Sequence, residues 1–255
     1  MTGKANAIGI DCGSSYCKGA LYSEGRIVAM TVCPTGWDIS STGSKVKAEL
    51  MGAQPNLPSD VPVVATGYGR EKISGSHKIT EITCHAKGAE FLFPGVSFVI
   101  DIGGQDSKVI KVEKGKVSAF LMNDKCAAGS GRFLEMVLDR MDLDLEGMEE
   151  LLAMNQAISL NGTCAVFAES EIIGLLAQGV PREQIIGGVA QTMAAKIASQ
   201  AARIGLSSPI VLTGGLAQSG GLRLALSDSL GQTVESAPKG IYAGAIGAAL
   251  LAREI

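Results

Sequence analysis

The stretch Ile10–Lys18 reads IDCGSSYCK, and the stretch Ile100–Lys108 reads IDIGGQDSK. Aligned at an offset of 90 residues, the two share an aspartate, a glycine and a lysine at matching places. The register continues, because Gly25 falls on Gly115 and each stands in a short charged turn. Apolar and β-branched residues flank the glycines, as is typical of strands joined by tight turns. The chain therefore contains two related units, each predicted to open with three strands joined by two glycine turns.

The rest of the chain alternates between strand and helix patterns. Short buried strands are predicted at 61–65 and 209–212. Helices are predicted at 44–52, 79–91, 130–141, 165–178, 181–204 and 240–253. The last of these is rich in small residues and therefore suited to close packing against another element. This alternation of strands and helices predicts an α/β fold.

Composition excludes several classes of protein. Of 255 residues, 46% are hydrophobic and 18% are charged, which is enough apolar surface for a sizeable core. The net charge is −3 and there is no long basic stripe, so we expect no nucleic-acid partner. The longest apolar run, 241–252, is too short to cross a bilayer, and no signal peptide precedes Asp11. We therefore expect a cytoplasmic protein with no membrane partner.

Three glycine-rich segments are candidates for binding phosphate, because main-chain N–H groups in such turns can approach an oxyanion. They are Gly13-Ser14-Ser15, Gly103-Gly104-Gln105, and Gly214-Gly215 with the later pair Gly220-Gly221. Two Asp-x-Gly hairpins related by pseudo-symmetry would clamp a polyphosphate from both sides. Asp11 and Asp101 would then hold Mg²⁺, through water. The alternative is that the glycines only serve hairpins and the aspartates only cap turns.

This arrangement resembles the nucleotide-binding superfamily of acetate kinase, sugar kinases, heat-shock chaperone ATPases and actin. The resemblance implies two related actin-like (ribonuclease H-like) domains with an ATP cleft between them. It implies a first domain at 1–94, to which 240–255 returns as a C-terminal helix, and a second domain at 95–239. It implies catalytic roles for Asp11, Asp101 and Gln105. The residues it implies for nucleotide binding are Gly13, Ser14, Ser15, Tyr16, Lys18, Gly103, Gly104, Asp106, Gly214, Gly215 and Gln218.

Two of the six cysteines stand directly before helical patterns. At a helix N-terminus the macrodipole favours the thiolate of Cys126 and of Cys164. Their spacing matches no local metal motif, so metal ligation and plain burial as small hydrophobes both stay open. No CxxC and no framework spacing occurs, so we expect no disulfides. Cys12 and Cys17 are predicted in strands that flank the first glycine turn, and Cys84 in a packed helix.

Six segments, two of which include glycine-rich stretches described above, resemble one family closely. They are ATGYGR (65–70), EITCHAKGA (81–89), VIDIGGQDSKVI (99–110), MNDKCAAGSGRFLE (122–135), TCAVFAESE (163–171) and LTGGLAQ (212–218). Together they look like the activators of 2-hydroxyacyl-CoA dehydratases, the family that also contains the ATPase subunits of benzoyl-CoA reductase. The resemblance extends over essentially the whole chain.

The resemblance implies a homodimer with one [4Fe–4S] cluster at its two-fold axis, and Cys126 and Cys164 match the ligand positions. Such a cluster usually takes four thiolates, which two cysteines per chain supply only across a symmetric interface. The implied activity is ATP hydrolysis, with Mg²⁺ and ATP or ADP bound, coupled to one-electron transfer. The implied donor is ferredoxin or flavodoxin, and the implied acceptor is an iron–sulfur enzyme of the dehydratase, benzoyl-CoA reductase or double-cubane type.

Other interpretations remain. A small-molecule kinase of the same superfamily would use Asp101 as its base, and a nucleotide-sensing regulator would use the cysteines only as core. His85 is expected to be a satisfied core histidine, with contact to the neighbouring domain or the nucleotide as the alternative. Glu169 and Glu171 are expected to stabilise the start of the helix after Cys164 through its dipole, with a role near Mg²⁺ or the cluster as the alternative.

Overall fold

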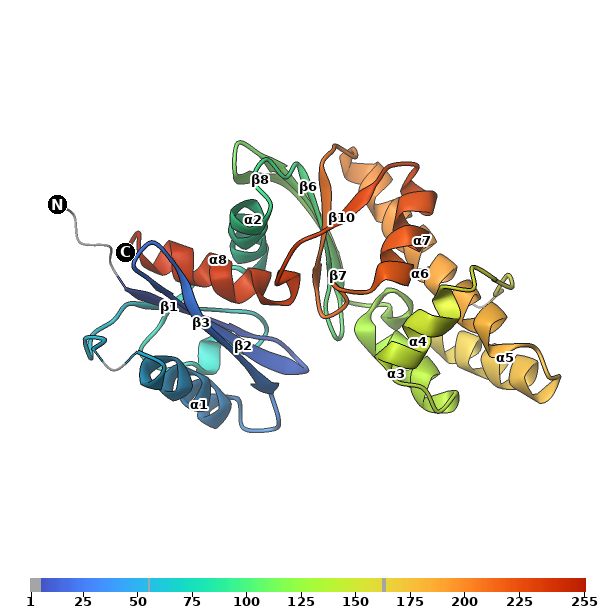
Figure 1. Cartoon of the computed structure of the whole chain (residues 1–255), viewed down its shortest axis with the longest axis horizontal. Coiled ribbons are helices and arrows are strands. Elements are labelled where there is room, and N and C mark those ends of the chain that lie inside the picture. The colour runs from blue at the N-terminus through green and yellow to red at the C-terminus, as the bar shows by residue number, and fades with distance from the viewer. Residues whose placement is uncertain (1–5, 55, 162–163) are drawn as a thin grey trace.

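Two five-stranded sheets form the framework of the computed structural model, which describes residues 6–54, 56–161 and 164–255 (Figure 1). The first sheet has the order β3-β2-β1-β4-β5 and the second the equivalent order β8-β7-β6-β9-β10. The first sheet comprises β1 Ala7–Cys12, β2 Tyr16–Ser23, β3 Arg26–Pro34, β4 Val63–Thr66 and β5 His77–Lys78. The second comprises β6 Phe98–Ile102, β7 Ser107–Glu113, β8 Lys116–Asn123, β9 Ile210–Gly214 and β10 Val234–Ser236.

The internal repeat extends to details of the strands. A bulge interrupts the pairing of β2 with β3 between Leu21 and Tyr22, and the same irregularity recurs in β7 between Lys111 and Val112, 90 residues later. The residue before each turn glycine, Glu24 or Lys114, has a φ of 52°. The predicted pair of three-stranded units is therefore confirmed.

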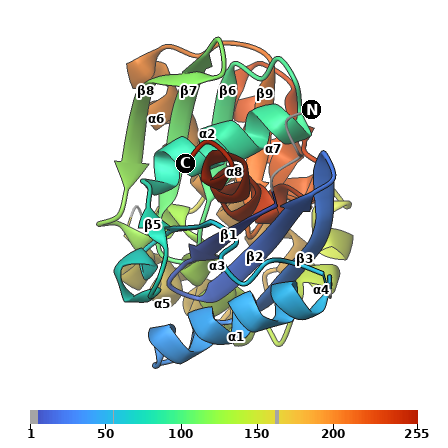
Figure 2. The same cartoon turned by 90° about the vertical axis from the view of Figure 1, so that its left-hand side faces the viewer.

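Helices cover both faces of each sheet (Figures 1 and 2). The α-helices are α1 Ile39–Gly52, α2 Glu81–Leu92, α3 Gly131–Arg140, α4 Leu145–Leu152, α5 Ala165–Ala177, α6 Arg182–Ile204, α7 Gly220–Leu230 and α8 Ala243–Ala252. Short 3-10 turns are η1 Arg70–Lys72, η2 Ala127–Gly129 and η3 Gly240–Tyr242. No helix within residues 6–54, 56–161 and 164–255 combines the length and the apolar character needed to cross a membrane.

Helices α2 and α8 lie between the two sheets and cross each other (Figure 2). Ile246 of α8 shares a buried cluster with Ala20 of the first sheet, so the C-terminal helix returns to the first half of the chain as expected. Ala89 of α2 shares a cluster with Val99 of the second sheet. The crossing therefore joins the cores of both halves.

Several element boundaries differ from the prediction. The helix expected from residue 44 begins at Ile39, because Asp38 accepts a hydrogen bond from the amide of Ser41 at 3.1 Å and caps it. The helix expected from residue 240 opens with the 3-10 turn η3. Helices α4 and α7 were not predicted.

The start of α7 corrects one expectation about phosphate binding. The pair Gly220-Gly221 opens this helix rather than forming a loop. Glu149 of α4 already accepts the amide of Gly221 at 2.9 Å and also contacts Ser219. This pair is therefore a capped helix start, and its position is explained by contact with α4.

Candidate functional site

The structure brings the two predicted phosphate loops into contact. Residues 13–15 connect β1 to β2, and residues 103–106 connect β6 to β7. A Cβ added at Gly104 would overlap the hydroxyl of Ser15 and lie 3.4 Å from that of Ser14. The two loops therefore face each other at van der Waals distance.

The second loop is held by the start of α3. The amide of Gly131 donates to the carbonyl of Gly103 at 2.9 Å, and the amide of Arg132 donates to the carbonyl of Gly104 at 2.7 Å. In a trans peptide the N–H points opposite to the C=O. The N–H groups of Gly104 and Gln105 consequently point away from α3, and within the described chain they donate no hydrogen bond.

The first loop is held in a similar way by Thr35, which is buried at the end of β3. Its hydroxyl donates to the carbonyl of Gly13 at 2.7 Å, and its amide donates to the carbonyl of Ser15 at 2.9 Å. The N–H of Ser14 therefore points away from the Thr35 hydroxyl. Two opposed loops with outward N–H groups are a suitable cradle for phosphate oxygens.

Asp11 and Asp101 lie near the ends of β1 and β6, and His85 of α2 lies between them. The distance from His85 Nδ1 to Asp101 Oδ1 is 3.0 Å, and that from His85 Nε2 to Asp11 Oδ2 is 3.6 Å. Both are ion pairs rather than aligned hydrogen bonds. All three residues are buried, so His85 joins the two repeats at their catalytic candidates. His85 is therefore buried, as expected, and it contacts the aspartates of both repeats.

Lys108 completes this charged group. Its ammonium lies 2.9 Å from Glu81, 2.8 Å from Asp106 and 3.4 Å from Asp101. The side chain is 1% exposed, so all of its charge is compensated by carboxylates of the protein. Asp101 also accepts a hydrogen bond from the hydroxyl of Thr213 at 2.8 Å. Asp106, predicted to bind nucleotide, therefore contributes an ion pair within its own hairpin.

The mutual charges shift the pKa values of these groups. Burial opposes the charged form of His85, but Asp101 outweighs it and raises the pKa of His85 to about 10. Burial likewise opposes ionisation of Asp101, yet His85 and Lys108 hold its pKa well below the usual range. Burial opposes ionisation of Asp11 as well, but its ion pair with His85 lowers the pKa of this carboxyl group. The imidazolium and both carboxylates are therefore charged at neutral pH.

The donor set fits a divalent cation. Four carboxyl groups, of Asp11, Glu81, Asp101 and Asp106, surround the cations His85 and Lys108, and Lys18 lies opposite Asp11 in the strand register. Among the described residues, Oδ1 of Asp11 is buried without a hydrogen-bond partner. Atoms of Asp11, Glu81 and His85 lie within 4.8 Å of one another. A protonated imidazole has no free lone pair, so the carboxylates are the available ligands. Hard oxygen donors of this kind suit Mg²⁺.

Room around Asp11 depends on glycine at two positions. A Cβ at Gly67, which follows β4 with a φ of +85°, would crowd Oδ1 of Asp11. A Cβ at Gly244 of α8 would overlap Oδ2. The end of β4 and helix α8 therefore both approach this carboxylate closely.

The remaining nucleotide-binding candidates lie around the same loops. Gly214 ends β9 with a φ of +89°, and the amide of Gly215 is taken by the carbonyl of Ile102 at 2.9 Å. Gln218 is exposed on the turn that follows. Tyr16 is half exposed at the start of β2, and Lys18 lies opposite Asp11 in the strand register.

Cys126 is half-buried directly before η2. Asn123 at the end of β8 brackets it: the side-chain amide donates to the carbonyl of Cys126 at 2.7 Å and the oxygen accepts its N–H at 3.2 Å. Lys196 of α6 lies 2.9 Å from the Cys126 sulfur. The ammonium lowers the pKa of this thiol, outweighing its partial burial.

Cys164 is exposed at the N-cap position of α5. The neighbouring residues 162 and 163, part of one motif quoted above, lie outside the described residues. The expectation that Glu169 and Glu171 lie in the first turn of the helix is wrong, because α5 begins at Ala165 and its first turn holds no acidic residue. Glu169 instead pairs with Arg140 of α3 at 2.6 Å, and Glu171 accepts the amide of Asn161 at 3.0 Å.

The other cysteines are structural, and all six are free thiols. Cys12 and Cys17 are buried and lie opposite each other in β1 and β2, and Cys33 lies opposite Cys17 in β3. Cys84 is buried in α2, where desolvation raises its pKa to about 12. These positions agree with the strand and helix environments that the sequence predicts.

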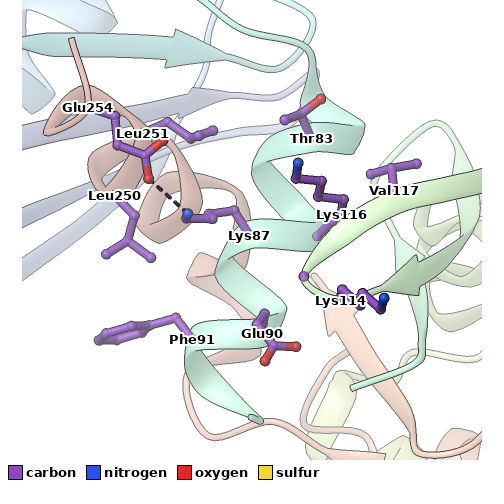
Figure 3. A pocket seen from close by; sticks show the side chains of 12 residues that line it. Thr83, Lys87, Glu90, Phe91, Lys114, Lys116, Val117, Leu250, Leu251 and Glu254 are labelled. Atoms are coloured by element: carbon purple, nitrogen blue, oxygen red, sulfur yellow. Dashed lines mark hydrogen bonds and ion pairs between the residues drawn. The ribbon is translucent and has the colours of Figure 1, made fainter. Parts of the chain in front are cut away.

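A groove of 650 Å³ lies away from the paired loops, between α2, the end of α8 and the turn joining β7 to β8 (Figure 3). Lys87 and Glu254 form an ion pair of 2.9 Å on its rim. Phe91 and Leu250 add apolar surface. None of the predicted site residues lines this groove.

Comparison with known proteins assigns the chain to a family. Residues 8–252 match the profile of the BadF/BadG/BcrA/BcrD ATPase family. The chain belongs to this family. It is 40% identical over 249 residues to the (R)-2-hydroxyglutaryl-CoA dehydratase activating ATPase of Acidaminococcus fermentans, covering 96% of each chain. It is 42% identical over 252 residues to the activator of lactoyl-CoA dehydratase of Anaerotignum propionicum, covering 97% of each.

A solved member of the BadF/BadG/BcrA/BcrD ATPase family has the same fold. The activator of the 2-hydroxyisocaproyl-CoA dehydratase from Clostridium difficile with bound ADPNP matches with a TM-score of 0.90 and 36% identity. The match covers 98% of this chain and 94% of that one. With the shared strand order of the two sheets, it confirms the α/β fold of two actin-like domains.

Proposed function

We propose that this protein is an ATP-dependent one-electron reductase that activates an iron–sulfur partner enzyme, and that a homodimer carries one [4Fe–4S] cluster. Its relatives include activators of dehydratases, and one solved relative binds ADPNP. The partner is an enzyme of the dehydratase, benzoyl-CoA reductase or double-cubane type. Ferredoxin or flavodoxin is the donor. The proposal goes beyond the family assignment, because it adds electron transfer and names the donor and acceptor classes.

One observation carries the proposal. The carbonyls of Gly103 and Gly104 in the second phosphate loop accept hydrogen bonds from the first amides of α3, at 2.9 and 2.7 Å. Cys126 lies a few residues before those amides, joined to them by η2. A displacement of the loop is therefore transmitted to the cysteine through one short, hydrogen-bonded segment. Such a connection is what an ATPase needs in order to act on a redox group.

The residues of the two loops supply the nucleotide-binding part of the proposal. The N–H groups of Ser14, Gly104 and Gln105 bind phosphate oxygens, and Asp11 and Asp101 hold Mg²⁺ through water. Gln105 orients the attacking water. The Asp101 carboxylate, which His85 and Lys108 keep ionised, acts through its negative charge on Mg²⁺ rather than as a base. The further contacts, to phosphate and to adenosine, come from Gly13, Ser15, Tyr16, Lys18, Gly103, Asp106, Gly214, Gly215 and Gln218.

Movement follows from the domain division, which we place at 1–94 with 240–255 and at 95–239. Helices α2 and α8 both belong to the first domain, and Ala89 of α2 packs against Val99 of the second. His85 joins the aspartates of the two domains. Mg²⁺ arriving with ATP would compete with the His85 imidazolium for Asp11 and Asp101. Nucleotide binding therefore replaces the His85 ion pairs between the domains by contacts through Mg²⁺, and the angle between the domains changes as a result.

Cys126 and Cys164 are the cluster ligands in this proposal. They are free thiols at least partly exposed, each directly before a helical segment, and soft thiolates are the ligands that iron–sulfur clusters take. Helices α3 and α5, which follow them, are linked by the Arg140–Glu169 ion pair. Two thiols per chain supply four across a two-fold axis. When bound, the cluster supplies a single low-potential electron.

Iron content tests the proposal. Purified without oxygen, the protein should be a brown dimer with about four irons that bleaches in air. Cys126→Ala and Cys164→Ala should each lose the iron, whereas Cys33→Ala, a matched change at a half-buried cysteine, should keep it. A colourless, iron-free chain would overturn the reductase in favour of a cluster-free ATPase. Iron retained in both ligand variants would show that other residues bind it.

A further inference from the structure

Lys196 lies outside all the sequence motifs described above, yet it contacts Cys126. The lysine belongs to α6 and is 70 residues from Cys126 in the sequence, yet its ammonium lies 2.9 Å from the Cys126 sulfur. Its neighbours on α6, Met193 and Ile197, are buried in the hydrophobic core beside the second sheet. The helix is therefore fixed by packing at this point, and the half-buried side chain is directed to the thiol.

Lys196 is closely surrounded by other side chains. A Cβ placed on Gly129 would lie 3.7 Å from the lysine stem, 3.5 Å from the Asn123 amide and 3.6 Å from the Ser107 hydroxyl. Asn123 in turn brackets the backbone of Cys126 and pairs with Ser107 across β7 and β8. Lys196, Asn123 and Gly129 thus form one packed arrangement around the cysteine.

We propose that Lys196 is a positioning residue for the redox group: it fixes the Cys126 side chain and its positive charge raises the reduction potential of the bound cluster. The inference rests on the proposed function, since it takes Cys126 as a ligand. Hydrogen bonds to ligand sulfurs and the local charge both set the potential of such clusters. A cation beside a thiolate favours the more negative, reduced state, because it offsets the added electron.

The test compares the midpoint potential of the anaerobic, iron-loaded protein with that of variants. Lys196→Met removes the charge and keeps the length of the side chain. It should shift the equilibrium for one-electron reduction about tenfold toward the oxidised state, a fall of about 59 mV. Lys196→Arg should restore most of the potential. The matched control is Arg203→Gln, which removes one exposed positive charge from the same helix, two turns further along, and should leave the potential unchanged.

The outcomes separate the inference from the proposed function. An iron-replete Lys196→Met protein with the wild-type potential overturns the inference, and so does an equal fall in Arg203→Gln, because net charge alone would then explain it. If Lys196→Met takes up no iron but retains the wild-type circular dichroism and ATP binding, the positioning role is supported. The midpoint potential is then measured on Lys196→Gln instead. A wild-type protein without iron would instead refute the proposed function.

Discussion

Buried charge at the centre of the molecule is shared among residues from four different elements. Asp101 comes from β6, and its partners His85, Lys108 and Thr213 come from α2, β7 and β9. Each of these groups is almost completely removed from water. Removing one partner leaves the others charged and desolvated, which costs more than the pair contributes. Single substitutions here are therefore expected to have large and distinguishable effects.

At Asp101 the expected effect is on catalysis. Asp101→Asn keeps the shape of the side chain and the hydrogen bond from Thr213, but it removes the charge that faces His85 and the proposed Mg²⁺. ATP turnover should fall about a hundredfold, as for loss of one electrostatic contact to the reacting groups, while the iron content stays the same. The measurement is phosphate release alongside iron analysis, with Asp60→Asn on an exposed turn as control. An unchanged hydrolysis rate would contradict the proposed ATP site between the two loops.

At His85 the expected effect is on stability. His85→Gln removes the cation between Asp11 and Asp101, so the free energy of unfolding should fall by about 3 kcal/mol. Urea titration of the nucleotide-free protein measures it. The chain offers a matched control, because His77, its only other histidine, is exposed on β5. His77→Gln should change stability by less than about 0.5 kcal/mol. Equal stability of the two variants would mean that His85 does not join the domains.

At the scale of elements, the crossing of α2 and α8 determines how the two halves meet. A Cβ on Gly88 would overlap the carbonyl oxygen of Ala243, and one on Gly247 would overlap that of Cys84. Both obstacles are backbone atoms, which cannot turn aside as a side chain can. The helices therefore approach as closely as glycine permits, and a small rotation at the crossing is transmitted to both sheets.

Gly247→Ala tests this closeness. The added methyl group must push the helices apart, so the protein should lose about 2 kcal/mol of stability, typical of overpacking, and unfold at a lower temperature. Gly52→Ala is the control, because a Cβ at the end of α1 meets nothing within 4 Å. Thermal unfolding of both proteins provides the comparison. A wild-type melting temperature for Gly247→Ala would contradict the packing described.

The sequence predicts those elements whose cause is local. The Asp-x-Gly hairpins and the long helix α6 follow from patterns within a dozen residues, and the structure confirms both. Thr35 could not be found this way, because its hydroxyl acts on Gly13, which is distant in sequence. The start of α7 depends likewise on Glu149 of another helix. His85 carried one signal, its presence in a segment shared with the family, but its two partners come only from the fold.

At the scale of the whole molecule, the two halves differ by one insertion. Among the residues that the structure describes, α1 and short turns connect β3 to β4, whereas η2 and four helices connect β8 to β9. Both proposed ligand cysteines lie in that insertion. The repeat therefore supplies the paired loops, and the added helices supply the residues by which a second copy and a redox group would be bound. The proposed nucleotide and cluster sites are therefore separated in sequence, and the segment from Cys126 to the start of α3 connects them.

The surface of α5 is where a second copy should bind. Val166 and Phe167 are 67% and 72% exposed beside Cys164, and Ile173 lies two turns further along. Exposed apolar side chains clustered at a half-complete ligand set favour a self-complementary interface. Phe167→Glu should therefore convert the proposed dimer to a monomer that has lost its iron but still binds ATP. Light scattering and iron analysis under anaerobic conditions measure both, with Leu224→Glu, an exposed leucine on α7, as control. A Phe167→Glu protein that remains an iron-loaded dimer would move the interface to another face.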